Sequence, residues 1–233
     1  MRSLRFHLEQ SLTVGEEISL TGPNHHHLAK VLRLRPGEEI QLFNGDGFNY
    51  QGQILALDGQ SSRIRINGQE NPHNESPLAL TLLLALIKGE AFERALQKAV
   101  ELGVKRIVPV LARRSEAKGL KEERCRGILI ASAMQCGRAV VPELMELTAL
   151  ETALAQWAPG WIFSPHHPNS GAATAPIRAL AIGPEGGFSE EEVARAIDLG
   201  WHSRRLGPRI LRADTAATVA LAQAQMLQGD LHV

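Results

Sequence analysis

The stretch that decides the fold is LALTLLLALI, residues 78–87. A continuous apolar run of this kind is typical of a strand that is buried on both faces. A helix is expected directly after it, at 90–102, because Phe92, Leu96 and Ala99 recur at helical spacing and Gly103 ends the pattern.

The same alternation continues toward the C-terminus. Further strands are expected at 106–111, 161–164 and 180–183, and helices at about 121–138, 150–157, 189–199 and 213–228. Strands that alternate with helices predict an α/β domain with a mostly parallel sheet.

The N-terminal third has a different pattern. Short alternating runs predict strands at 16–20, 38–43, 48–57 and 63–66, with a turn at 44–47. One short helix is expected to begin near Pro23, to bury a stripe of Leu28, Val31 and Leu32, and to end at Pro36-Gly37. Residues 69–77 are polar with two prolines, which is typical of a linker. We therefore expect a small β-rich domain at 1–72 and an α/β domain at 73–233.

Composition excludes several classes of protein. The chain has 233 residues, 44% of them hydrophobic, and its longest apolar run is about half of the ~20 residues that cross a bilayer. The first residues lack the pattern of a signal peptide, so we expect a soluble, cytoplasmic protein without membrane contact. Cys125 and Cys136 lie about 16 Å apart on the predicted helix, too far for a disulfide. The histidines at 25–27 and 166–167 lack ligand spacing, and no metal is expected.

The 25 basic and 25 acidic residues balance, but they are unevenly distributed. Residues 85–142 carry 12 basic and 6 acidic side chains, and 19 of the basic residues of the whole chain are arginines. Arginine forks suit phosphates and base edges, so a local RNA-binding surface is one interpretation. Solvated helix faces are the other.

Two glycine-bearing loops are the candidates for chemistry. The first, IGPEGGFSEEE at 182–192, leads from a strand into a helix that Ser189 can cap. Three glutamates in the first turn would repel a phosphate, and neither GxxxxGK[ST] nor GxGxxG occurs in the chain. A nucleoside without phosphates fits a backbone that glycine leaves open. An ordinary tight turn explains the spacing equally well.

The second loop, LGPRILRADTAA at 206–217, precedes an alanine-rich helix that Asp214 or Thr215 can cap. The small side chains of this helix suit either core packing or close contact with another subunit; they are Ala216, Ala217, Ala220, Ala222 and Ala224.

In these loops the sequence closely resembles the SPOUT superfamily of S-adenosylmethionine-dependent RNA methyltransferases. Within it, the chain is similar to the bacterial family that methylates N3 of a uridine in 16S ribosomal RNA. Further segments fit this family in order: RFHL, HHHLAKVLRLRPGEEIQLFNGDG, KGEAFERALQKAVELGVKRIVPVLARRS and QCGRAVVPE. The loop at 165–176 has no match.

The resemblance implies an N-terminal PUA-like β-barrel that holds RNA and a trefoil-knotted α/β methyltransferase domain that forms a homodimer. It also implies S-adenosylmethionine as the cofactor. The residues expected to bind it are Phe163, Ile182, Gly183, Pro184, Glu185, Gly186, Gly187, Leu206, Gly207, Ile210, Leu211, Arg212 and Thr215.

Methyl transfer to uracil N3 requires an accessible base that loses its N3 proton. Arginine near the ring carbonyls would stabilise the resulting anion, and Arg138 and Arg212 are the candidates. Asp214 and Glu185 are candidate proton acceptors, although each of these residues can equally serve a structural ion pair or cap. Contacts to the RNA backbone, within 16S rRNA and the 30S subunit, are expected from Arg5, Arg33, Arg35, Arg113, Arg114 and Arg138.

Two other functions stay open at this point. One is a methyltransferase of the same type that acts on another RNA or on a ribose 2′-hydroxyl. The other is a non-catalytic RNA-binding factor for ribosome assembly, which would have no affinity for the cofactor.

Overall fold

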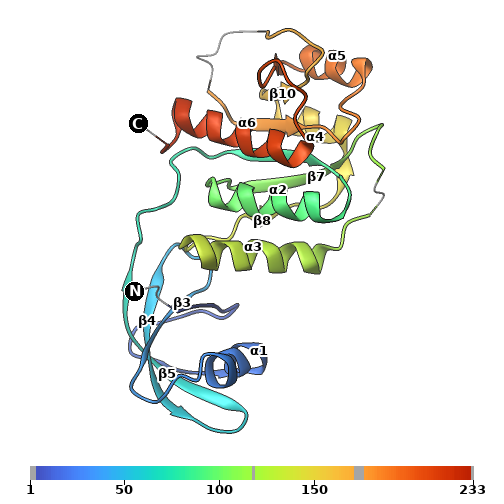
Figure 1. Ribbon diagram of the computed structural model, residues 1–233. Helices are drawn as coiled ribbons and strands as arrows, with labels where there is room; N and C mark the ends of the chain where they lie inside the picture. The colour runs from blue at the N-terminus through green and yellow to red at the C-terminus, as the bar shows by residue number, and fades with distance from the viewer. Residues whose placement is uncertain (1–3, 117–118, 171–175, 232–233) are drawn as a thin grey trace. The chain divides into compact units, whose positions relative to one another are not determined.

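The computed structural model describes residues 4–116, 119–170 and 176–231 (Figure 1). The chain forms two compact units. Unit 1 consists of the described residues up to Glu75 together with Ala133–Val140, and unit 2 consists of Ser76–Ser132 and the chain from Val141 onward. No helix within the described ranges is both long and apolar enough to cross a membrane.

Unit 1 is built on a five-stranded sheet with the order β1-β3-β4-β5-β2. Its strands are β1 (Arg5–His7), β2 (Glu17–Thr21), β3 (Glu39–Phe43), β4 (Asn49–Leu57) and β5 (Ser61–Glu70). Alternate residues such as Leu42, Ile54 and Ile64 are fully or almost fully buried and form its core. The four predicted strands are present, and the β-rich character of this region is confirmed. The three-residue β1, which pairs parallel to β3, was not predicted.

The helical segment of unit 1 differs from the prediction in one respect. A short α1 (Gly22–His26) continues into a π-helical turn, His27–Val31. The prediction that Val31 lies in the apolar stripe is wrong, because its side chain is 56% exposed while Leu28 is fully buried. A π-turn closes over five residues instead of four, so it rotates the following positions away from the face that an α-helix would bury.

Unit 2 contains a parallel sheet with the order β12-β10-β11-β6-β7-β8, and β9 pairs with β7. The strands are β6 (Thr81–Ala85), β7 (Arg106–Leu111), β8 (Glu143–Leu144), β9 (Thr148–Ala149), β10 (Trp161–Phe163), β11 (Ala179–Ile182) and β12 (His202–Arg204). Every pair is parallel, which confirms the predicted α/β class. All five residues of β6 are buried, as its apolar sequence predicts. The trefoil knot stays a prediction.

Helices cover both faces of this sheet (Figure 1). On one face, α2 (Gly89–Glu101) and α6 (Ala213–Gln228) lie side by side. On the other, α4 (Leu150–Trp157) and α5 (Glu190–Asp198) share a core with Leu83, Val108 and Ile162. The remaining helix, α3 (Glu122–Cys136), contributes its last turn to unit 1. Ala217, Ala220 and Ala224 of α6 are completely buried within the chain, so these three small residues serve core packing.

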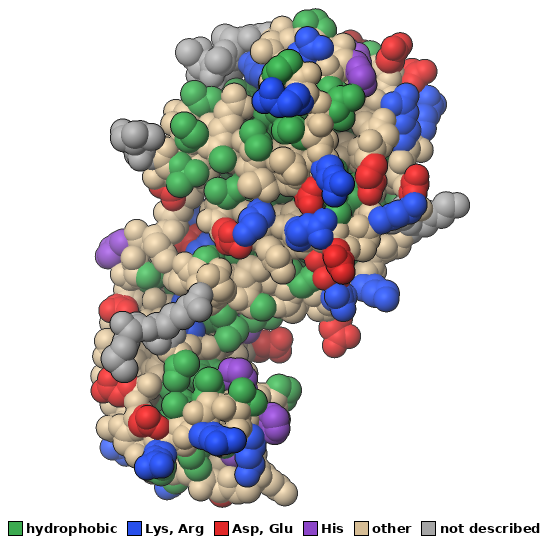
Figure 2. All heavy atoms as spheres, viewed as in Figure 1, with side chains coloured by type: hydrophobic (Ala, Val, Ile, Leu, Met, Phe, Trp, Pro, Cys, Tyr) green, Lys and Arg blue, Asp and Glu red, His purple; other side chains and the backbone are tan. Residues whose placement is uncertain are grey.

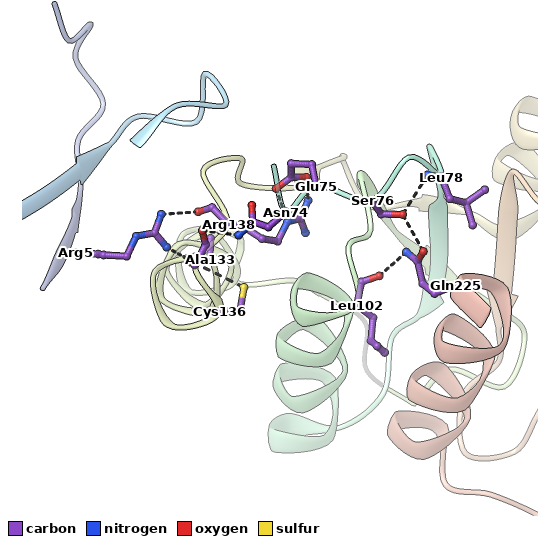
Figure 3. Close-up of polar contacts among 11 residues, drawn as sticks. Arg5, Asn74, Glu75, Ser76, Leu78, Leu102, Ala133, Cys136, Arg138 and Gln225 are labelled. Atoms are coloured by element: carbon purple, nitrogen blue, oxygen red, sulfur yellow. Dashed lines mark hydrogen bonds and ion pairs between the residues drawn. The ribbon is translucent and has the colours of Figure 1, made fainter. Parts of the chain in front are cut away.

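A buried glutamine ties the first residue of unit 2 to its last helix (Figure 3). Gln225 is 0% exposed, donates from Nε2 to the Leu102 carbonyl at 2.7 Å, and accepts from Ser76 Oγ at 2.8 Å. A Cβ at Gly103 would lie 2.9 Å from that of Ser76, and Gly103 has a φ of +75°. Only glycine therefore fits between this hydrogen-bonded pair and the end of α2.

Candidate functional site

Three neighbouring strands of unit 2 end at the same level. Phe163, the last residue of β10, is in register with Ile182 of β11 on one side and with Arg204 of β12 on the other. Loops that follow the carboxyl ends of adjacent parallel strands meet at one edge of the sheet, where α/β proteins bind ligands. The fold thus brings together the segments that the sequence predicts to bind the cofactor.

The first glycine loop, residues 183–189, is a tight turn held by its own backbone. Gly187 donates to the Pro184 carbonyl at 2.8 Å and has a φ of +67°. A Cβ at Gly183 would lie 3.1 Å from the Phe188 nitrogen. Ser189 caps α5 in a reciprocal capping box with Glu192, which confirms the predicted cap. The glycines at 183 and 187 are therefore required by the turn itself, whatever it binds.

Arg114 contacts the second glycine of this loop, Gly186. Its Nη1 donates to the Gly186 carbonyl at 2.8 Å, and a Cβ at Gly186 would lie 3.3 Å from the Arg114 Cβ and Cδ. The neighbouring Arg113 pairs with Glu191 at 2.9 Å, and its backbone nitrogen donates to Glu192. Both arginines, predicted as RNA contacts, thus join the glycine loop and the start of α5. Their contact with RNA stays a prediction.

The second loop, residues 205–212, is exposed and enters α6. Gly207 has a φ of +80°, Ile210 is 76% exposed, and Arg212 is exposed. The prediction that Asp214 or Thr215 caps α6 is wrong: the cap position is Arg212, whose carbonyl accepts from the Ala216 nitrogen at 2.7 Å. Because this bond already closes the first turn at Arg212, the two predicted caps lie inside the helix.

A small cavity of about 60 Å³ lies between the ends of β10 and β12 and the second loop. Five predicted cofactor residues line it: Phe163, Leu206, Gly207, Ile210 and Leu211. The other lining residues are Ser164, Pro165, Arg204, Arg209 and Ala216, so most of the walls are apolar and two arginines stand among them. Apolar walls beside loop backbone fit a nucleobase and its sugar. We name this space the inner cavity.

A larger cavity of about 390 Å³ opens on the other side of the same loop. It lies where β6 leads into α2 and is lined by Ile87, Ala91, Arg94, Glu185, Ile210, Leu211, Arg212, Ala213 and Asp214. We name it the outer cavity. Ile210 and Leu211 line both cavities. The predicted residues Ile182, Gly183, Pro184, Gly186, Gly187 and Thr215 are all described and line neither.

One ion pair dominates the outer cavity. Arg94 Nε donates to Asp214 Oδ2 at 2.9 Å, and the Thr215 nitrogen donates to Asp214 Oδ1 at 2.9 Å. Partial burial alone would raise the pKa of Asp214, but these hydrogen bonds outweigh it and lower the pKa below its ordinary value. Opposite, Glu185 is exposed and accepts from the Lys88 nitrogen at 3.2 Å. Sequence reasoning missed Arg94, because an arginine at a polar position of α2 gives no indication that it pairs with Asp214, 120 positions further along the chain.

Two further predicted residues, Arg5 and Arg138, belong to unit 1 (Figure 3). Arg138 is 3% exposed, and its Nε and Nη2 donate to the two carboxylate oxygens of Glu75 at 2.9 and 2.7 Å. Arg5 donates to the carbonyls of Ala133 and Arg138, each at 3.0 Å, and to Asn49 Oδ1 at 2.7 Å. These contacts support a structural role for both guanidinium groups. Their catalytic or RNA-binding role stays a prediction.

The remaining predicted RNA contacts, Arg33 and Arg35, are exposed in unit 1. His25 is 5% exposed with Nδ1 2.7 Å from Ser62 Oγ, so it serves the core of that unit. Among the residues that the structure describes, no cluster of three histidine, cysteine or acidic side chains could hold a metal ion. Cys125 and Cys136 are free thiols. Residues 171–175 of the unmatched loop lie outside the described ranges.

Comparison with known proteins extends over the whole chain. A family described as "RNA methyltransferase domain" matches residues 74–225, and one described as "RNA methyltransferase PUA domain" matches residues 20–67. The ribosomal RNA small subunit methyltransferase E of Synechocystis is 34% identical over 224 residues, covering 90% of this chain and 73% of that protein. The enzyme of the same name from Buchnera aphidicola of Schizaphis graminum is 29% identical, with 97% of each chain covered.

Two solved structures are similar over nearly the full length. The ribosomal RNA small subunit methyltransferase E of Neisseria gonorrhoeae, bound to S-adenosyl methionine, is 34% identical with a TM-score of 0.92. A Legionella pneumophila protein, in complex with the bound cofactor SAM, is 34% identical with a TM-score of 0.91. In both cases 99% of this chain and 100% of the other are covered. The family that the two glycine loops indicate is thereby confirmed, and the chain belongs to the RNA methyltransferases that combine this domain with an N-terminal PUA domain.

Proposed function

We propose that the chain is an S-adenosylmethionine-dependent methyltransferase that modifies N3 of a specific uridine in 16S rRNA of the small ribosomal subunit. The observation that carries the proposal is that the strands before the two glycine loops, β11 and β12, end level with β10 at one edge of the sheet, where the second loop lines the inner cavity. The chain is also similar over nearly its whole length to cofactor-bound methyltransferases. A ribosomal substrate also implies a cytoplasmic location.

The cofactor supplies an electrophilic methyl group on a sulfonium when it is bound. Apolar side chains around the inner cavity, chiefly Phe163, Leu206 and Leu211, would hold its adenosine part. About 60 Å³ is room for roughly two water molecules, so binding requires the exposed loop around Ile210 to move outward. The turn at 183–187, which follows the neighbouring strand β11, is held by the hydrogen bond from Arg114 to the Gly186 carbonyl.

On the RNA side, the domain at 1–72 would hold the ribosomal RNA and the domain at 73–233 would carry out the reaction. The target base must leave its pairing to expose N3. Arg212 would stabilise negative charge on the ring carbonyls, and Asp214 or Glu185 would accept the proton. Arg5, Arg33, Arg35, Arg113, Arg114 and Arg138 remain the proposed RNA contacts, which would give affinity more than sequence choice.

A homodimer is part of the proposal. The outward side of α6 carries exposed apolar side chains, including Val219 at 41%, Met226 at 57% and Leu227 at 53% exposure. Figure 2 shows hydrophobic side chains over this helix. Large exposed apolar side chains that gather on one helix favour a protein interface.

A tritiated-methyl assay tests the proposal. Intact 30S particles that lack the modification are compared with stripped 16S rRNA, and the product is digested to nucleosides. We expect N3-methyluridine, and saturable binding of S-adenosylmethionine by calorimetry. Formation of 2′-O-methyluridine would show that the ribose hydroxyl, and not N3, is the target. If S-adenosylmethionine gave no binding heat at high concentration, the enzymatic function would be excluded in favour of an assembly factor.

A further inference from the structure

We propose that the outer cavity receives the target base and that Asp214, positioned by Arg94, selects uracil over cytosine there. This inference rests on the proposed function, because it assigns a binding site and a specificity-determining carboxylate to the same reaction. At about 390 Å³, the outer cavity lies within the size range of small-ligand sites, whereas the inner cavity does not.

The location suits methyl transfer. The inner and outer cavities adjoin at Ile210 and Leu211, which line both. A cofactor in the inner cavity and a base in the outer cavity would therefore approach each other at this short segment. Transfer between two bound reactants requires the reacting atoms to come within about 3–3.5 Å, so the outward movement of the loop around Ile210 that cofactor binding requires must also open the segment between the two cavities.

The lining of the outer cavity matches a nucleobase. Ile87, Ala91 and Leu211 provide apolar walls for the faces of a planar ring. Charged groups of both signs stand among them: the Asp214 carboxylate and the exposed Arg212 guanidinium. A few polar groups in an apolar cavity are the usual means of fixing the orientation of a ligand.

Asp214 is held as a fixed acceptor. Its side chain is only 15% exposed, and its two oxygens are tied to Arg94 Nε and to the Thr215 nitrogen, each at 2.9 Å. A carboxylate offers about four lone-pair directions, so these two bonds leave acceptor capacity toward the cavity. Arg94 makes its own second contact on α2, with Glu90 at 3.5 Å, so the pair is anchored outside the cavity.

This arrangement distinguishes the two pyrimidines at the atom that reacts. Uracil presents an N3–H donor between two carbonyl oxygens, which matches a carboxylate flanked by a cation. Cytosine presents a bare N3 acceptor, whose lone pair would face the Asp214 carboxylate, and an amino group where Arg212 needs an acceptor. An unpaired buried polar group of this kind lowers affinity about 5–150-fold, so cytosine binds more weakly than uracil before any chemistry begins.

The same contact disposes of the proton. The N3 proton would pass to an Asp214 oxygen before the methyl group arrives, because the lone pair that this frees on N3 lies along the former N3–H direction. The N3–methyl bond would then form as the methyl–sulfur bond of the cofactor breaks, with the bonding electron pair left on sulfur and S-adenosylhomocysteine as the leaving group. The neutral carboxyl group then releases the proton to solvent. Arg94 and the Thr215 nitrogen hold the pKa of Asp214 below its ordinary value, so the carboxylate stays ionised and can accept the N3–H hydrogen bond. The same contacts make it a weak base that returns the proton readily to solvent.

Two variants, Asp214→Asn and Arg94→Met, test the inference against a matched control, Glu93→Gln. Glu93 also lies on α2 and pairs with an arginine, Arg124, but lines neither cavity. We measure cofactor affinity by calorimetry, the melting temperature, and the single-turnover rate on saturating 30S particles. We expect unchanged cofactor affinity in all three, a rate about 100-fold lower in Asp214→Asn, a rate about 10-fold lower in Arg94→Met, and no change in the control.

A second substrate tests the selectivity directly. Particles reconstituted with cytidine at the target position should be methylated about 5–150-fold more slowly than the uridine particles by the wild type. Asp214→Asn should discriminate less between the two bases, because an amide can also donate. Wild-type rates in both variants would overturn the inference. A loss of cofactor affinity as large as the loss of rate would also overturn it, because the outer cavity would then belong to the cofactor. Absence of N3-methyluridine from the wild type would instead overturn the proposed function.

Discussion

Replacing Arg114 with alanine should weaken cofactor binding, although we do not expect the Arg114 side chain to touch the cofactor. Its effect passes through the glycine loop. Arg114 holds the glycine loop through one charged hydrogen bond, from Nη1 to the Gly186 carbonyl at 2.8 Å. A second contact, to the Phe188 carbonyl, is 3.4 Å long and adds little. Without these contacts the turn is less ordered in the free protein. It must then become ordered when the cofactor binds, which makes the free energy of binding less favourable.

The magnitude follows from the first hydrogen bond. Hydrogen bonds to charged groups contribute about 1.5–3 kcal/mol, and the exposure of Arg114 places this one at the lower end. Since about 1.4 kcal/mol changes an equilibrium constant tenfold, the dissociation constant for S-adenosylmethionine should rise about tenfold. The free energy of unfolding should change much less, because the loop is a small part of the structure.

Calorimetric titration with S-adenosylmethionine is the assay, and Arg113→Ala is the matched control. Arg113 is the adjacent arginine, but its side chain pairs with Glu191 in an exposed ion pair, 66% and 73% accessible, that contributes little. Equal cofactor affinity in Arg114→Ala and the wild type would refute the reasoning. If both variants instead bound RNA less tightly, with a reduced salt dependence, the two arginines would be phosphate contacts.

Other predictions concern stability, titration and the glycine loop. Arg138→Met should lower the free energy of unfolding in urea by about 3 kcal/mol, because it removes the guanidinium partner of the largely buried Glu75 carboxylate. A loss below about 1 kcal/mol would contradict a structural role. Gln225→Leu should cost about 2 kcal/mol in the same assay, because the Leu102 carbonyl and Ser76 lose a buried partner. Burial, with the hydrogen bond to Asp46, raises the pKa of Tyr50 to about 12, so absorbance titration of the single tyrosine should give that midpoint instead of the ordinary 10.0. The folded state favours the neutral phenol, so the stability that Tyr50 contributes is complete below pH 10 and is lost as the pH rises through 12; Tyr50→Phe should remove this dependence. Gly186→Val should weaken cofactor binding at least about tenfold and leave the circular dichroism spectrum unchanged, because even a Cβ would lie 3.3 Å from the Arg114 side chain and would displace it from the loop; unchanged affinity would exclude this loop from the site.

Long periodic segments were predictable, and of the strands with two or three residues only β10, which is wholly apolar and buried, was predicted. The bounds of β7, α4 and α6 agree with the sequence to the residue, because each combines a strong apolar pattern with clear end signals. The strands β1, β8, β9 and β12 have two or three residues each. Such short segments become strands only through neighbouring strands that pair with them, and their own sequence carries no periodicity to detect.

The candidate site was predictable to a similar degree. Glycine and proline after buried strands identified both loops, since turn chemistry is local. The pairs that organise those loops are not local: Arg114 meets Gly186 across 72 positions, and Arg94 meets Asp214 across 120. Only the folded sheet places these side chains together. For the same reason the sequence could not distinguish Arg138 as a catalytic group from Arg138 as the partner of Glu75.

The composition of unit 1 has a practical consequence for dissecting the protein. The last turn of α3 and the residues up to Val140 belong to this unit, although more than fifty residues separate them from Glu75. A fragment that stops at the polar segment near residue 72 would leave Arg5 without the carbonyls of Ala133 and Arg138. It would also omit Glu75, the partner of Arg138, and the segment 133–140 that belongs to the same unit. Expression of the isolated N-terminal region for RNA-binding measurements should therefore supply residues 133–140, for example as a tethered peptide.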